Sequence, residues 1–187
     1  MNPSSSNLTH KRVLGVAIPI VLANATIPIL GAVDTGVVGQ MGLAAPIGAV
    51  GIGAIIISAI YWLFGFLRMG TTGLTAQAIG SNDHSETSAL LVRGIIIGLV
   101  AGLILILIQI PLFSAALGIA PASQEVEGLA NEYLKIRVFS APAAIAIFGI
   151  TGWLIANERT RAVLVLMLLI NSINIVLDFV FVLRLGW

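Results

Sequence analysis

The first long apolar stretch of the chain reads VLGVAIPIVLANATIPILGAVDTGVV over residues 13–38. About 20 consecutive apolar residues let a helix cross the hydrocarbon of a bilayer, so this stretch predicts a membrane-spanning helix. The same stretch carries a carboxylate, Asp34. A charged side chain at the centre of a membrane costs roughly 3 kcal/mol on insertion scales. A chain that keeps such a group is expected to use it, and the default expectation is a proton or cation site.

The composition places the whole chain among integral membrane proteins. Of the 187 residues, 58% are hydrophobic and only 9% are charged, and the mean hydropathy is +1.08. Soluble domains average about 25% charged residues, so this chain has too few polar side chains to cover a globule. The net charge of +1 argues against a nucleic-acid partner. There is no cysteine, and the two histidines lie far apart, so neither an enzyme nor a bound cofactor is expected.

Five apolar segments are long enough to cross a bilayer. They predict an all-α integral membrane protein with about five transmembrane helices. The second segment is longer than a bilayer requires, so its end is expected to tilt or to project past the membrane. The expected helices cover residues 13–38, 46–80, 90–113, 133–156 and 162–183.

The positions of Lys and Arg predict the orientation. Two basic residues lie in the N-terminal tail, residues 1–12, and Arg159 and Arg161 lie between the fourth and fifth helices. Cytoplasmic segments carry an excess of basic residues, so the tail is expected in the cytoplasm, and helices one, three and five run outward. Lys135 and Arg137 would then begin the fourth helix on the outside. We interpret both as snorkelling to the outer interface.

The fifth helix carries three polar residues on one face. Asn171, Asn174 and Asp178 follow one another at spacings of three and four, which bring side chains together on a helix. Because the first and fifth helices run in the same direction, Asp34 and Asp178 both fall in the outer half of the membrane. Asp34, Asn174 and Asp178 are therefore the predicted coupling site for a cation or proton, with Asn171 as an accessory residue. The alternative for the asparagines is hydrogen bonding between helices alone.

Two further residues are candidates for a role in transport. Pro19 removes a backbone hydrogen bond inside the first helix and favours a kink, so it is the candidate hinge. The alternative is that membrane helices tolerate proline without any such role. Gln77, near the end of the second helix, is ambiguous and is kept as a possible accessory residue of the coupling site.

Three stretches carry a family resemblance. The sequence PILGAVDT at 28–35, preceded by Pro19, resembles the first helix of multidrug and toxic compound extrusion (MATE) transporters. The stretch RMGTTGLTAQA at 68–78 is similar to the second helix of their DNA-damage-inducible protein F branch. The stretch NSINIVLD at 171–178 resembles their fifth helix. The resemblance covers nearly the whole chain in order.

The resemblance implies a fold of twelve helices in two six-helix lobes around a central cavity. Residues 13–187 would supply helices one to five of the N-terminal lobe, and thus a partial lobe. An acidic residue on helix one and an Asn and Asp pair on helix five belong to the cation-coupling site of the family, and they match Asp34, Asn174 and Asp178. The proline that matches Pro19 is associated with bending of helix one.

The implied function is cation-coupled export of organic cations or amphipathic drugs across a bacterial inner membrane. The coupling ion would be a proton, or a sodium ion held by Asp34, Asn174 and Asp178. The expected partners are the lipid bilayer, the small-molecule substrate and, if the chain is a fragment, a missing second lobe. One alternative is a truncated membrane fragment without transport activity. Another is a flippase for lipid-linked precursors, which a pocket lined by several basic residues would favour.

Overall fold

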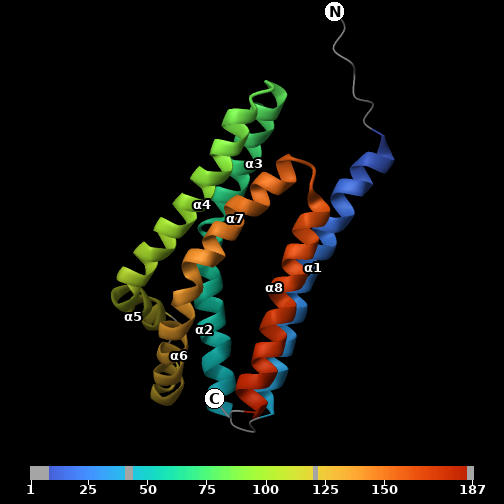
Figure 1. Ribbon diagram of the computed structural model, residues 1–187. Coiled ribbons are helices and arrows are strands. Elements are labelled where there is room, and N and C mark those ends of the chain that lie inside the picture. The colour runs from blue at the N-terminus through green and yellow to red at the C-terminus, as the bar shows by residue number, and fades with distance from the viewer. Residues whose placement is uncertain (1–8, 41–43, 120–121, 185–187) are drawn as a thin grey trace, which may run out of the picture.

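A computed structural model describes residues 9–40, 44–119 and 122–184 of the chain, and the regular structure in these ranges is helical (Figure 1). Five helical spans are long and apolar enough to cross a membrane. This confirms the prediction of an all-α fold with about five transmembrane helices. The spans are His10–Val37, Ala44–Gly80, His84–Leu107, Gln124–Ala156 and Thr160–Phe181.

Several of these spans are built from more than one helical piece. The pieces, in chain order, are α1 (His10–Gly39), α2 (Ala44–Trp62), α3 (Gly65–Gly80), α4 (His84–Leu107), α5 (Gln109–Ile119), α6 (Gln124–Arg137), the 3-10 turn η1 (Val138–Ser140), α7 (Ala141–Ala156), α8 (Thr160–Asp178) and the π-helical segment η2 (Phe179–Arg184). The first and fifth predicted helices differ from α1 and from α8 with η2 by no more than three residues at either end.

The interior spans differ more from the prediction, and proline accounts for two of the differences. The predicted helix 90–113 is divided, because α4 ends at Leu107 and α5 begins at Gln109. Pro111 has no N–H to donate, and its ring would clash with the carbonyl of Leu107 four residues earlier. The ring of Pro142 would likewise clash with the carbonyl of Val138, four residues earlier. Val138 is the first residue of η1, the 3-10 turn that interrupts the fourth span. That span also begins at residue 124, earlier than the predicted 133.

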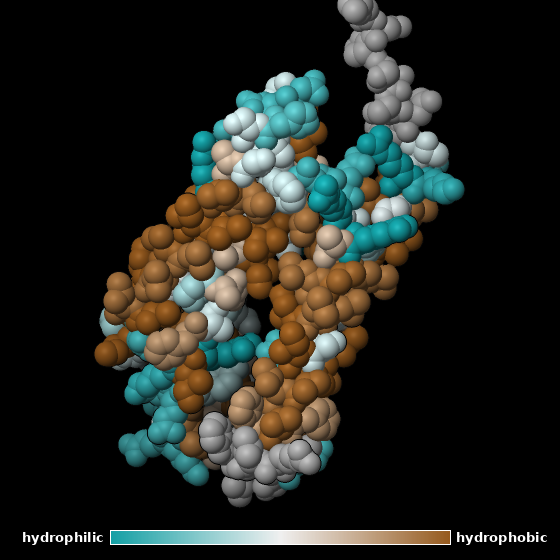
Figure 2. Space-filling model, viewed as in Figure 1, coloured by the Kyte–Doolittle hydropathy of each residue, from teal (hydrophilic) through white to brown (hydrophobic). Residues whose placement is uncertain are grey.

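The helices form two groups that lie next to each other. In one group α7 packs against α3 and α4, and α2 packs against α6. In the other group α1 and α8 lie side by side along their length (Figure 1). A broad apolar band crosses the molecular surface between two polar ends (Figure 2). The band indicates the part of the surface that faces hydrocarbon.

Glycines bring α4 and α7 into backbone contact. Gly94, Gly98 and Gly102 are buried at spacings of four on one face of α4. A Cβ atom added at Gly98 would lie 2.5 Å from the Cα of Ala146 on α7, and one added at Gly102 would meet the backbone of Pro142. Small residues at such spacing let membrane helices approach closely and gain dispersion energy. The α4–α7 contact is thus a rigid centre for the first group.

We expect Gly98→Ala to destabilise the protein by about 1–3 kcal/mol, because the new methyl group overpacks a contact between two backbones. Gly70→Ala on α3 is the matched control, since a Cβ atom there meets nothing within 4 Å. The control should be neutral, or stabilising by about 0.5–1 kcal/mol from its better helix propensity. Unfolding in mixed micelles, followed by circular dichroism, measures both. Equal stability of the two variants would contradict the close α4–α7 contact.

Candidate functional site

Two contacts between polar side chains hold α1, one to the turn before α8 and one to α8 itself. At one end the Arg12 guanidinium donates to Glu158, with 2.6 Å between Nη2 and Oε1 and 3.3 Å between Nε and Oε2. Further along, the Asn171 amide donates to Thr26 Oγ1 at 2.6 Å. The paired residues are 146 and 145 positions apart in the sequence. The start of α1 thus lies beside the start of α8, so the two helices run in parallel. Because both rise equally per residue, the Thr26–Asn171 contact sets their register.

This register brings the two predicted carboxylate positions to the same level. An offset of 145 residues sets the backbone of Asp34 level with Phe179, the neighbour of Asp178. Asp34 lies on α1 five residues before the end at Gly39, and its side chain lies outside the described part of the structure. Asp178 is the last residue of α8 and is half-buried. The parallel helices therefore supply one carboxylate each at the end remote from Arg12.

The asparagines of α8 are half-buried and make different hydrogen bonds. Asn171 donates across to α1, as described above, whereas Asn174 donates to the carbonyl of Ile170 in its own helix at 3.1 Å. The Asn174 amide group is thus held by α8. Its carbonyl oxygen is the atom suited to a cation, because hard cations take oxygen ligands. Asn174 and Asp178 lie one helical turn apart.

Thr26 is a partner that sequence reasoning missed. Its hydroxyl accepts the Asn171 hydrogen bond and donates to the carbonyl of Ala23 at 2.6 Å. The sequence did contain a signal that could have identified Thr26. It lies eight residues before Asp34, which is two spacings of four, and therefore on the same face of α1. We call Thr26, Asn171, Asn174, Asp178 and the Asp34 position the polar seam of α1 and α8.

The remaining candidates lie in different places. Pro19 is a buried residue inside α1, between Arg12 and Thr26, which make the two contacts described above. Gln77 is exposed near the end of α3, a helix that packs mainly against α4 and α7. The structure therefore keeps Pro19 beside the polar seam and does not bring Gln77 to it.

A second polar cluster lies where the second and fourth spans are interrupted. The Tyr61 hydroxyl lies 3.2 Å from Ser140 Oγ, which donates to the carbonyl of Arg137 at 2.7 Å. Arg137 Nε is buried and has no hydrogen-bond partner among the described residues. Arg137 as a whole is half-buried, and Lys135 is exposed, so the snorkelling of both residues to the outer interface stays a prediction. The cluster joins the end of α2 to the junction of α6 and α7.

The MatE family model matches residues 19–180, which is most of the chain. The chain belongs to the MATE transporter family. Its members are transporters and not enzymes, as the sequence predicted. The MATE chain is 38% identical over 170 residues to the DNA damage-inducible protein F of Escherichia coli K12, covering 91% of this chain and 37% of that protein. It is 24% identical over 168 residues to the multidrug export protein MepA of Staphylococcus aureus, covering 90% and 37%.

Solved structures share the fold of this MATE chain. A MOP superfamily transporter from Pyrococcus furiosus superimposes with a TM-score of 0.85 at 23% identity, over 95% of this chain and 39% of that one. A MATE transporter in complex with MaD3S gives a TM-score of 0.83 at 23% identity, over 94% and 39%. The chain thus spans less than two-fifths of the length of these relatives. It is a multi-pass membrane protein with bacterial homologues.

We expect the hydrogen bond between Thr26 and Asn171 to couple α1 and α8 energetically. A double-mutant cycle of Thr26→Ala and Asn171→Ala should give a coupling free energy of about 0.6 kcal/mol, and at most about 1.7 kcal/mol. Thr35→Ala combined with Asn171→Ala is the control, because Thr35 bonds to the carbonyl of Gly31 in its own helix. Its coupling should be close to zero. Unfolding in mixed micelles measures both cycles, and equal values would contradict a specific contact across the seam.

Proposed function

We propose that this MATE chain acts as the N-terminal lobe of a cation-coupled antiporter that exports organic cations or amphipathic compounds. The membrane is the bacterial inner membrane, with the N-terminus on the cytoplasmic side. One observation carries the proposal: the common register of α1 and α8 sets the Asp34 position level with Asp178. Family membership supports the same function, because an S. aureus relative is named a multidrug export protein.

Protonation of Asp34 or Asp178 is the coupling step. A neutral carboxyl group removes the cost of holding a charge in a closed, dry cavity, so protonation favours the closed arrangement. Protonation also changes the hydrogen bonding of α1, and Pro19 offers this helix a second, bent arrangement. The result is a two-state element whose equilibrium depends on the proton, which is what coupling requires.

Competition for the same negative charge explains the exchange of substrate and ion. A cationic substrate favours the ionised carboxylates, and an incoming proton removes the charge that attracts it. Two carboxyl groups close together exchange protons as a pair, so the site is expected to bind protons in two coupled steps. A sodium ion is the alternative coupling ion, because the oxygens of Asp34, Asn174 and Asp178 form a ligand set suited to a hard cation.

Two other functions make different predictions. A transport-inactive membrane fragment is compatible with a chain that spans 37% of the length of its E. coli relative. This alternative predicts no coupled efflux from any form of the protein. A flippase for lipid-linked precursors requires several basic residues in its pocket.

We expect Asp34→Asn and Asp178→Asn each to reduce proton-coupled efflux roughly 5- to 150-fold, the range of a coupling energy of 1–3 kcal/mol. Efflux of a fluorescent organic cation from vesicles is measured with the whole protein encoded by the gene, under an imposed pH gradient and then a sodium gradient. Glu132→Gln is the control, because Glu132 is exposed on α6, away from the seam. Full coupled efflux in both aspartate variants would overturn the proposal, and absence of efflux in the unmodified protein would favour the inactive fragment.

A further inference from the structure

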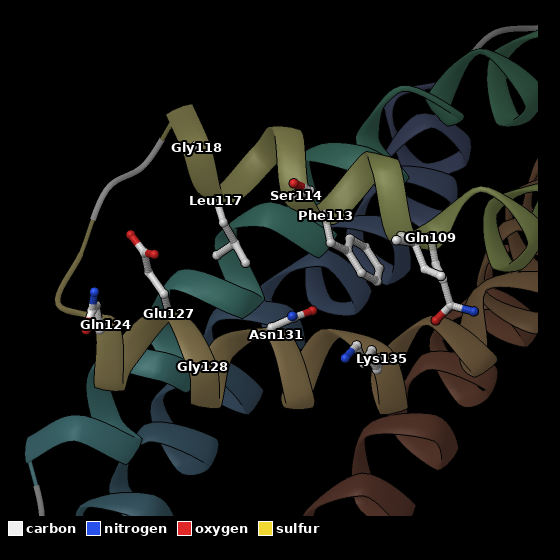
Figure 3. Close-up of a pocket in the computed structure, with 11 residues that line it drawn as sticks. Gln109, Phe113, Ser114, Leu117, Gly118, Gln124, Glu127, Gly128, Asn131 and Lys135 are labelled. Carbon is white, nitrogen blue, oxygen red and sulfur yellow. The ribbon is translucent and has the colours of Figure 1, made fainter.

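A crevice of about 590 Å³ lies between α5 and α6, away from the polar seam (Figure 3). The two helices contact each other and present residues at spacings of four toward the crevice, so that each set lies on one helical face. The set from α5 is Gln109, Phe113 and Leu117, and the set from α6 is Glu127, Asn131 and Lys135. Gln109 and Lys135 lie toward one end of the crevice, and Leu117 and Glu127 lie toward the other (Figure 3).

The face of α6 that lines the crevice carries a negative charge at one end and a positive charge at the other. Glu127 Oε1 accepts a hydrogen bond from the backbone N–H of Ala122 at 3.0 Å, which holds the carboxylate near the start of α6. An ionised carboxylate has about four acceptor sites, so Glu127 keeps capacity for a ligand. Lys135 is exposed, and its ammonium has no hydrogen-bond or ion-pair partner among the described residues. Asn131 stands between the two charges.

The length of the fourth span puts the crevice at the edge of the hydrocarbon. This span covers Gln124–Ala156 and consists of α6, the 3-10 turn η1 and α7. Lys135 is 21 residues from Ala156, the difference between their numbers, which corresponds to about 31 Å along a helix. The hydrocarbon of a bilayer is about 30 Å thick, so Lys135 sits at its boundary when Ala156 lies at the opposite one. The rest of the crevice, toward Glu127, then extends into the polar layer.

Exposed apolar side chains lie on the hydrocarbon side of this boundary. On the fourth span, Ile136 is 76% exposed and Phe139 is 66% exposed. At the end of α4, next to Gln109, Leu107 is 82% exposed. A ligand with a charged head and an apolar tail would therefore meet matching surfaces on both sides of Lys135.

We propose that the α5–α6 crevice binds a zwitterionic phospholipid with a primary amine in its headgroup. The phosphate lies at Lys135 and the Gln109 amide, the ammonium group points along the crevice toward Asn131 and Glu127, and the acyl chains cover Ile136. The opposite charges at the two ends of the crevice match a headgroup that carries both signs. Glu125, exposed near the start of the same helix, disfavours a lipid with net negative charge.

This lipid site is independent of the coupling mechanism. It uses none of the residues of the polar seam, and its test measures lipid retention without any transport. Under the orientation proposed above, the lipid belongs to the outer leaflet.

The test measures binding of phosphatidylethanolamine to the whole purified protein by native mass spectrometry from detergent. Lys135→Gln should weaken binding about fivefold, since a basic residue near a membrane surface contributes about 1 kcal/mol to attraction of an anionic headgroup. Gly128→Leu should weaken it at least as much by filling the crevice. This variant is expected to fold, because a Cβ atom at Gly128 meets nothing within 4 Å. Glu132→Gln is the control and should leave binding unchanged.

Several outcomes would overturn the proposal. One is retention of phosphatidylethanolamine by Gly128→Leu at the level of the unmodified protein. Another is equal retention of phosphatidylglycerol or phosphatidylcholine, since the first lacks the ammonium group and the second lacks its hydrogen-bond donors. A third is binding of free phosphoethanolamine as tightly as the lipid, which would indicate a water-soluble ligand.

Discussion

The absence of water from hydrocarbon is the constraint on which this structure depends. Every backbone N–H and C=O group at membrane depth must find a partner within the protein, so the spans are helical and their breaks need compensation. The breaks in the second and fourth spans lie next to each other, as the contact between Tyr61 and Ser140 shows. Ser140 also satisfies the carbonyl of Arg137 at the end of α6. Two interruptions are thus stabilised by one small polar cluster.

The two groups of helices differ in how much of their apolar surface the described part of the chain covers. The second, third and fourth spans bury 28–39% of their most apolar windows, whereas the first and fifth bury only 6%. Backbone contact at glycines stabilises α4 against α7, whereas α1 and α8 pack along their length and are also joined by the Thr26–Asn171 hydrogen bond. The polar seam lies on this pair.

The sequence predicted the parts of the fold that depend on local pattern. Hydropathy located five spans, and prolines 111 and 142 carried a readable signal for the breaks that follow Leu107 and Arg137. The interruption between α2 and α3 has no proline, so its position depends on tertiary contact and could not be predicted. The same holds for the candidate site. The spacing of the polar residues in the sequence predicted that those of α8 share one face. Only the packing of the helices shows that Asn171 bonds to Thr26 and that Gln77 lies on a different helix.

The two side-chain contacts of α1 lie on either side of Pro19, the candidate hinge. Pro19 lies between Arg12, which bonds to Glu158 in the turn before α8, and Thr26, which bonds to Asn171 on α8. A bend at Pro19 changes the distance between these two contacts, so at least one of them must break or shift. Neither contact is strong, because exposed ion pairs contribute little and side-chain hydrogen bonds between membrane helices average about 0.6 kcal/mol. In the proposed mechanism, protonation at the far end of the seam bends α1, while the glycine contact between α4 and α7 stays undisturbed.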